Sequence, residues 1–214
     1  MASTTDRQVF YTSPLLTHEP GTQVFAVDDP DRTPLTVLRR IYGACRRREQ
    51  VVCQAPDAEP IYRMPDRLVC VDEAQRPTRQ QLDDSLRALF RATDEHSAKC
   101  PLCERTRVFW STRQRCLIGT RMVEAVGDLN SYRGKVHPWL NGEHLDPSLA
   151  YADQRVTVRR PGQPDVTGRI TKIRFPDGGG IEWHEPGEMG RALVALPDQK
   201  VPELLPIDQL YPQP

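Results

Sequence analysis

Two cysteines separated by two residues, in Cys100-Pro-Leu-Cys103, constrain this 214-residue chain more than any other feature. A tight turn with this spacing can direct two thiolates at one tetrahedral metal ion. His96 precedes the pair by four residues, and Cys116 follows it after twelve intervening residues. We therefore interpret Cys100, Cys103, Cys116 and His96 as the ligands of one structural zinc ion.

The fourth ligand is the point at which the chain departs from a known family of zinc folds. The Cys-Pro-Leu-Cys knuckle, followed by an expected hairpin, resembles the treble-clef family of zinc folds, in which a knuckle, a hairpin and a helix contribute ligands. That resemblance implies a fourth ligand about three residues after Cys116, but Gly119 stands there. His96 is our first choice for the missing ligand, and the alternatives are Cys70, Cys53 and His137.

The overall composition indicates the cellular compartment of the chain and limits the kinds of partner that it can attract. Lys and Arg together number 29, and Asp and Glu also number 29, so no long-range field attracts the whole chain to a polyanion. We find neither a cleavable leader nor a run of about 18 apolar residues, which predicts a cytoplasmic protein with no membrane contact. In a reducing compartment the six cysteines favour metal ligands and buried thiols over disulfides.

Residues 1 to 150 are expected to form an α+β domain stapled by the zinc ion. Thr33-Pro34 offers a helix start, and Leu35, Leu38 and Ile41 follow at helical spacing, so the pattern predicts a helix from Pro34 to Arg48. Short apolar runs predict strands at residues 23–27, 51–53, 61–64 and 68–71.

A second helix is predicted from Arg79 to Ala92. Thr78 and Gln81 make a capping-box pattern before apolar residues that recur at helical spacing. After the knuckle, residues 106–110 read as a strand, and residues 115–118 read as its return strand or as the start of a helix through Val126. Residues 127–150 are rich in Gly, Pro, Asn and Asp, so we expect an irregular linker there.

Residues 151 to 214 change in character. Short alternating runs are separated by turns at 155–158, 168–173, 181–183, 191–196 and 201–210. A Gly168-Arg-Ile turn enters the second run, and an Asp-x-Leu pattern, Asp208 to Leu210, lies near the end. This order of features resembles the SH3-like barrel superfamily, including KOW and Tudor-type modules. The resemblance implies a five-stranded β-barrel but no particular ligand.

Two groups of arginines are candidates for nucleic-acid contact. Arginines and aromatic rings surround the knuckle, a mixture that suits phosphates and unstacked bases. Three more arginines form the end of the first expected helix. The residues concerned are Arg105, Arg107, Trp110, Arg113, Arg115, Arg46, Arg47 and Arg48. The alternative interpretation is that they only solvate a hairpin face and complement a helix C-terminus.

One cluster of His and carboxylate residues raises the question of catalysis. His137, Glu143, His144 and Asp146 could serve a metal-dependent nuclease of the His-Asn-His type, but the order of that motif is not reproduced. We therefore expect a non-enzymatic zinc-binding protein that docks on nucleic acid or on a protein complex that handles it. The alternative is a structural or adaptor protein, of a phage for example, that uses zinc only for stability.

Overall fold

The computed structural model describes residues 14–16, 18–43, 48–104, 115–145, 150, 152–174 and 190–213. These residues form two antiparallel five-stranded sheets together with helices, which confirms the mixed α+β class. The chain divides into two compact units, Met1–Asn130 and Ser131–Pro214, so the division falls inside the expected linker. None of the described helices is long and apolar enough to cross a membrane.

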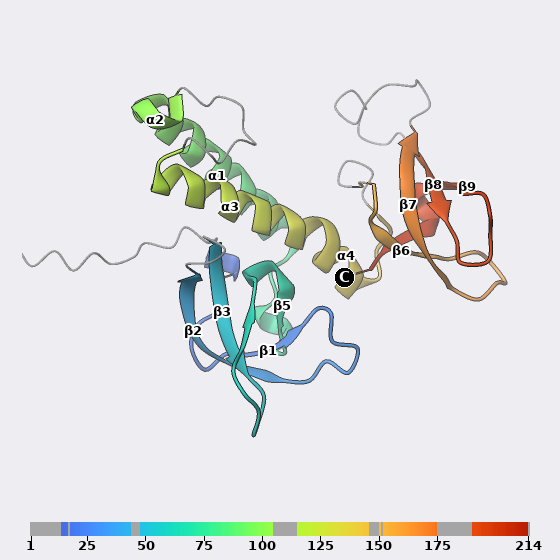
Figure 1. Ribbon diagram of the computed structural model, residues 1–214, viewed down its shortest axis with the longest axis horizontal. Coiled ribbons are helices and arrows are strands. Elements are labelled where there is room, and N and C mark those ends of the chain that lie inside the picture. The colour runs from blue at the N-terminus through green and yellow to red at the C-terminus, as the bar shows by residue number, and fades with distance from the viewer. Residues whose placement is uncertain are drawn as a thin grey trace, which may run out of the picture. The chain divides into compact units, whose positions relative to one another are not determined.

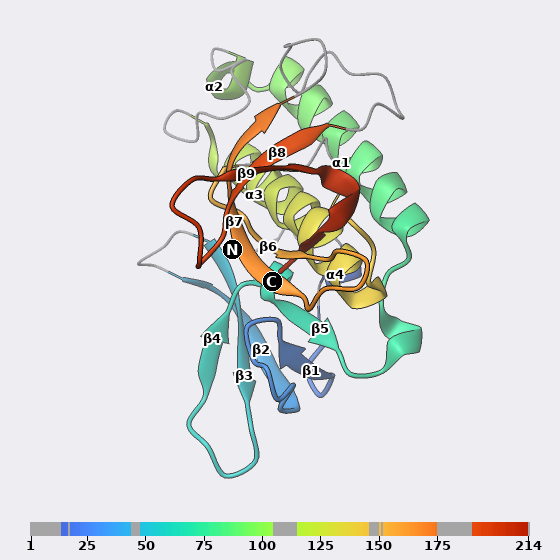
Figure 2. The ribbon, with the colours of Figure 1, turned by 90° about the vertical axis from the view of Figure 1, so that its right-hand side faces the viewer.

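The first sheet belongs to the first unit and has the strand order β4-β3-β2-β1-β5 (Figures 1 and 2). Its strands are β1 (Gln23–Ala26), β2 (Leu35–Gly43), β3 (Arg48–Gln54), β4 (Ile61–Arg63) and β5 (Leu68–Cys70). One buried hydrophobic cluster of the strands includes Val24, Val37, Val51 and Leu68. The four strands expected from short apolar runs in this region are confirmed.

The helix predicted from Pro34 to Arg48 is wrong, because β2 and β3 occupy this segment. Leu35 and Val37 are buried while Leu38 is 41% exposed, so the side chains alternate instead of following a helical stripe. A bulge between Val37 and Arg39 shifts the register and produces spacings that imitate a helix. β-branched and aromatic residues in the segment pack well on a pleated sheet, which favours the strand.

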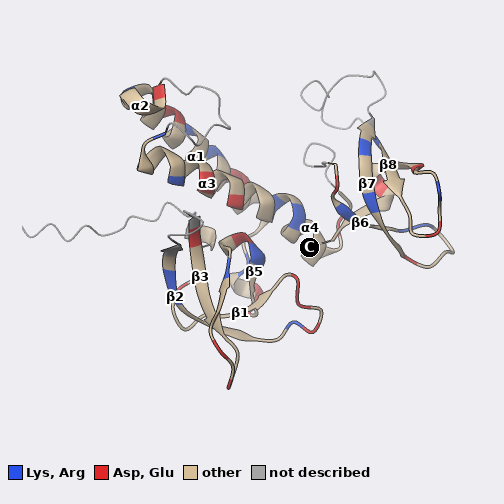
Figure 3. Ribbon diagram, in the orientation of Figure 1, with Lys and Arg blue, Asp and Glu red and all other residues tan. Residues whose placement is uncertain are grey.

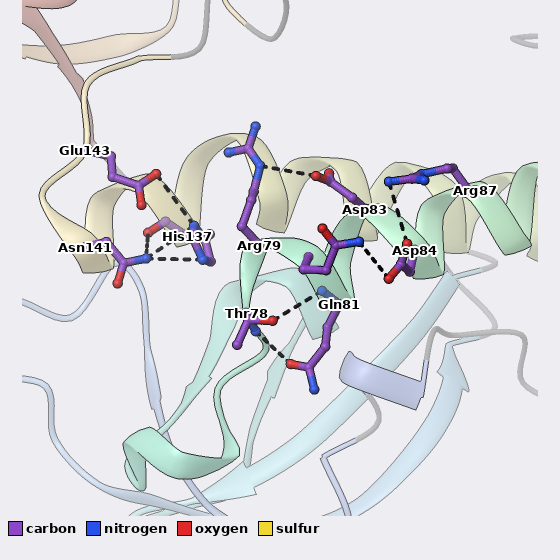
Figure 4. Close-up of polar contacts among 10 residues, drawn as sticks. Thr78, Arg79, Gln81, Asp83, Asp84, Arg87, His137, Asn141 and Glu143 are labelled. Carbon is purple, nitrogen blue, oxygen red and sulfur yellow. Dashed lines mark hydrogen bonds and ion pairs between the residues drawn. The ribbon is translucent and has the colours of Figure 1, made fainter.

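Three helices of the first unit are α1 (Arg79–Lys99), α2 (Pro101–Glu104) and α3 (Leu117–Ser131). α1 starts where the capping box predicts: the Thr78 side chain accepts from the Gln81 N–H, and the Gln81 side chain accepts from the Thr78 N–H (Figure 4). It continues beyond the predicted end at Ala92. In Figures 1 and 2, α1 and α3 lie side by side on one side of the first sheet.

The expectation of an irregular linker from residue 127 is also wrong over its first half. α3 extends to Ser131 and is followed by a π-helical turn at Tyr132–Val136 and by α4 (His137–Asn141). Leu129, Tyr132 and Val136 recur at helical spacing and are each at most 2% exposed. Gly142, at φ 64°, ends α4 in the left-handed conformation that favours glycine.

The second sheet has the strand order β10-β6-β7-β8-β9. Its strands are β6 (Arg155–Val158), β7 (Val166–Arg174), β8 (Arg191–Ala195), β9 (Glu203–Pro206) and β10 (Leu210–Pro212). The run at 181–183 lies outside the described residues, and the run at 201–210 divides into β9, a 3-10 turn and the start of β10. Within the described residues, hydrogen bonding between the edge strands β9 and β10 is not seen, so closure into a barrel stays a prediction.

A buried carboxyl group lies on β3 of the first unit. Glu49 is 7% exposed, and its Oε1 lies 3.5 Å from Nη1 of Arg40. Burial raises the pKa of Glu49 to about 7, although Arg40 and Arg121 oppose the shift. The folded chain therefore binds this proton more tightly than the unfolded chain, whose glutamate has an ordinary pKa.

We predict that the neutral Glu49 carboxyl stabilises the fold at pH 5 and that this stabilisation is lost as the pH rises through about 7. Relative to Glu49→Gln, the wild type should lose up to about 3 kcal/mol of unfolding free energy between about pH 5 and pH 8. Urea denaturation at both pH values measures the difference. Exposed Glu59→Gln is the control, and parallel pH profiles of wild type and Glu49→Gln would contradict the prediction.

Gly168 of β7 faces the core of the second unit at a point with no room for a side chain. A Cβ there would lie 2.5 Å from Val194 Cγ1 and 2.9 Å from Leu196 Cδ2. We predict that Gly168→Ala lowers the free energy of unfolding by about 1–3 kcal/mol, measured by urea denaturation. The control is Gly127→Ala on α3, where a Cβ meets nothing within 4 Å and should leave stability unchanged or raise it. Equal effects of the two changes would contradict the prediction.

Candidate metal centre

Three successive pieces of the first unit supply the side chains of this centre. His96 lies on the last turn of α1, and Cys100 is the residue that ends that helix. Cys103 lies in α2, and Cys116 directly precedes α3. The structure thus brings together the four side chains that the sequence analysis selected as metal ligands.

The donor atoms have the spacing of a shared ion. All four lie within 4.8 Å of one another. His96 Nε2 is 3.1 Å from Cys116 Sγ and 3.5 Å from Cys103 Sγ, and the two sulfurs are 3.6 Å apart. Tetrahedral coordination with metal–sulfur bonds of about 2.3 Å separates two sulfurs by about 3.8 Å. The cluster could therefore hold a metal ion, and within the described ranges it is the one such group.

Backbone hydrogen bonds hold the ligand-bearing turns. The N–H groups of Cys103 and Glu104 both donate to the carbonyl oxygen of Cys100 at 2.9 Å, which folds the knuckle tightly. At the start of α3, the Gly119 N–H donates to Cys116 Sγ at 3.3 Å. Cys116 thus accepts from the open end of α3 in the manner of a helix cap.

Two of the thiols have shifted pKa values in opposite directions. A backbone hydrogen bond from Cys103 is the largest cause that lowers the pKa of Cys100. Burial raises the pKa of Cys103 to about 11. Since metals bind thiolates, an ion entering this centre must displace the proton of Cys103.

Gly119 lies against the centre, a role that the sequence analysis did not identify. A Cβ at this position would lie 2.6 Å from Cys103 Sγ and 3.5 Å from His96 Nε2. The space that a side chain at residue 119 would need is therefore taken by the sulfur of Cys103, with the ring of His96 in contact. The treble-clef resemblance expects a ligand at this residue. The sequence did contain one signal of this contact, because a glycine within a helix can mark a place where a side chain would clash.

The alternative ligands lie elsewhere in the fold. Cys53 is fully buried in the core of the first sheet, and its burial raises the pKa of its thiol to about 11. Cys70, at the end of β5, has its Sγ 3.8 Å from Nδ1 of buried His18. Neither thiol belongs to the metal cluster, so both fit the interpretation as core cysteines.

The His and carboxylate cluster is partly described. His137 is hydrogen-bonded with the Asn141 side chain, and its Nδ1 lies 3.9 Å from Glu143 Oε2 (Figure 4). His144 is exposed and its Nδ1 is 3.1 Å from the carbonyl oxygen of Leu145. Asp146 lies outside the described residues.

Two of the candidates for nucleic-acid contact fall within the described residues. Arg115 is half-buried beside Cys116, and the backbone of Arg48 lies in β3. The remaining candidates lie outside the described residues, namely Arg46, Arg47, Arg105, Arg107, Trp110 and Arg113. Their contact with nucleic acid stays a prediction.

Comparisons with known proteins give no relative for this arrangement. No protein-family model matches the chain, and neither the search of curated proteins nor the search of solved structures finds a significant match.

We predict that Gly119→Ala weakens metal binding by roughly tenfold or more, because the added methyl group displaces Cys103 Sγ from the other donors. Competition with a chromophoric chelator measures the affinity of the full chain for the metal. Gly127→Ala, on the same helix but in open space, is the matched control and should bind as tightly as wild type. An unchanged affinity in Gly119→Ala would contradict the role assigned to this glycine.

Proposed function

We propose that this chain is a non-enzymatic binding protein in which a structural zinc ion supports docking on nucleic acid or on a protein complex that handles it. The observation that carries the proposal is the closed donor set of His96, Cys100, Cys103 and Cys116. Four protein ligands fill a tetrahedral shell and leave no position for a substrate or an activated water. A centre of this kind stabilises structure instead of performing chemistry.

Zinc is the metal that this donor set favours. Three sulfurs and one imidazole nitrogen are soft or borderline ligands, and zinc takes such combinations in tetrahedral structural sites. The spacing of 3.1 to 3.6 Å among His96 Nε2, Cys103 Sγ and Cys116 Sγ supports tetrahedral coordination. Hard cations such as magnesium require oxygen ligands, and this centre offers none from its four side chains.

The position of the ligands along the chain connects the metal to docking. Cys103 and Cys116 bracket a segment that carries Arg105, Arg107, Arg113 and Arg115 with Phe109 and Trp110. A metal bound by both cysteines would fix both ends of this segment and lower the entropy that it loses on binding a partner. Guanidinium groups and aromatic rings together suit phosphates and unstacked bases.

A protein partner is the second candidate, and a specific observation favours it. Leu102 of the knuckle and Leu117 at the start of α3 are each 58% exposed, and Ile118 is 42% exposed. Exposed large apolar side chains, here two consecutive residues of α3 and one of the knuckle, are typical of interaction surfaces. A net charge of zero also removes any long-range preference for a polyanion. On this alternative the zinc ion supports an adaptor surface.

The test of the proposal combines metal content with oligonucleotide binding on one sample of the full chain. We expect one zinc per chain in wild type and in Cys70→Ser, and loss of the zinc in Cys100→Ser. Binding of a labelled single-stranded oligonucleotide should fall steeply between about 50 and about 200 mM salt and should weaken in Cys100→Ser. Cys70→Ser is the matched control because its thiol lies outside the cluster.

Each result of this test has a consequence. If the chain contains zinc but does not bind the oligonucleotide in a salt-sensitive way, the proposed partner changes from nucleic acid to a protein. Absence of metal from wild type would overturn the proposal at its centre. Cutting of the oligonucleotide that depends on added divalent ions and disappears in His137→Ala would establish an enzyme instead.

A further inference from the structure

The strands of the second sheet carry an excess of positive charge. They contain Arg155, Arg169, Lys172, Arg174 and Arg191, but their one acidic residue is Glu203. Figure 3 shows this excess as basic positions along β6 and β7. These residues were not candidates from the sequence, because they are distributed over three separate segments that become neighbouring strands only in the fold.

Strand register places the described basic side chains on one face. Arg155 of β6 is directly opposite Arg169 of β7, and Arg169 is opposite Ala195 of β8. Beyond a bulge, Lys172 is opposite Leu193, which lies two residues from Arg191 on β8. Val156, Ile170 and Val194 alternate with these positions and are 0% exposed, so they define the core face. The cations lie on the outer face, where each is exposed.

This arrangement costs stability. Like charges directly opposite one another on neighbouring strands repel, as Arg155 and Arg169 do here. Among the residues that the structure describes, Arg155, Arg169, Lys172 and Arg191 have neither an ion pair nor a side-chain hydrogen bond. Arg159 and Arg160 at the margin of the same sheet do find acids, Asp165 at 3.0 Å and Glu203 at 2.7 Å. Within the described parts of the second unit, the outer face is therefore a concentration of cations without an acidic partner.

An aromatic group extends the same face. Tyr211 of β10 is opposite Thr157 of β6. Thr157 is two residues from Arg155, so its side chain lies on the same face of the sheet. The Arg159 guanidinium stacks over the Tyr211 ring, with its Cζ 4.1 Å from the ring centroid. The exposed Arg159 guanidinium, backed by the Tyr211 ring, offers a flat π surface on which a nucleic-acid base can stack.

We propose that the outer face formed by Arg155, Arg169, Lys172 and Arg191 binds the phosphate backbone of single-stranded nucleic acid, with Arg159 and Tyr211 stacking on a base. Guanidinium forks match phosphate oxygens, and an anion between Arg155 and Arg169 relieves their repulsion. The neighbouring stacked pair favours nucleic acid over an acidic peptide, which has no bases to stack. This surface is additional to the docking segment between Cys103 and Cys116 and does not require the metal.

The test is fluorescence anisotropy of a labelled oligo(dT) with the full chain over a range of salt concentrations. We expect Arg155→Gln/Arg169→Gln to bind roughly tenfold more weakly at low salt. The slope of log K against log salt should fall by about 1.4, which is about 0.7 for each lost phosphate contact on a single strand. The thermal stability of this double variant should equal or exceed that of wild type, because the substitution removes a repulsion between exposed groups.

The matched control removes the same charge from the exposed surface of α1. Arg87→Gln/Arg91→Gln should bind oligo(dT) as wild type does. Equal weakening in both double variants would show a general charge effect and overturn the proposal, as would unchanged binding in Arg155→Gln/Arg169→Gln. Competition by poly-glutamate as effective as that by oligo(dT) would reassign the face to acidic proteins. The difference between the double variants should persist with Cys100→Ser added, which separates this proposal from the metal-dependent one.

Discussion

The convergence of one imidazole and three thiols is the constraint on which the helical part of the first unit depends. His96 and Cys100 lie at the end of α1, Cys103 lies in a helix of four residues, and Cys116 stands before α3. A helix as short as α2 has almost no stability of its own in water. A metal shared by the cluster would join the ends of all three helices at one point, so its binding free energy would become folding free energy.

Local signals predicted the elements that local chemistry determines. Thr78 and Gln81 predicted the start of α1 because a capping box is complete within four residues. The segment from Leu35 failed because a bulge beyond Val37 imitates helical spacing, and only pairing with β3 reveals the strand. Composition misled us after Val126, since Gly127 and Gly134 are tolerated in a helical segment whose apolar residues are buried. Tertiary packing overrode the weak propensity signals in both places.

The candidate sites differ in how far the sequence reveals them. Ligand chemistry restricts a metal centre to few residue types, so residue type and spacing indicated the three cysteines and placed His96 first among four candidates for the remaining ligand. The fold then placed His96 beside the cysteines. The reason for Gly119 required the position of Cys103 Sγ, which depends on the fold. The basic face was hidden for a different reason, because the opposition of Arg155 and Arg169 exists only in the strand register. The spacing of these arginines along the sequence does not show that they share one face of a sheet; only the pairing of the strands shows it.

Residues 104 to 115 lie between two candidate metal ligands, which has a consequence for how such a chain can diversify. The entropy of closing a loop grows only with the logarithm of its length, so each doubling costs about 0.6 kcal/mol. Cys103 and Cys116 belong to separately folded turns, and each turn is held by its own backbone hydrogen bonds. Insertions or replacements between them would leave the ligand geometry intact. If the cluster holds a metal and the proposed docking role is right, the centre would be a fixed frame around an exchangeable segment, and partner choice could change while the fold around it is preserved.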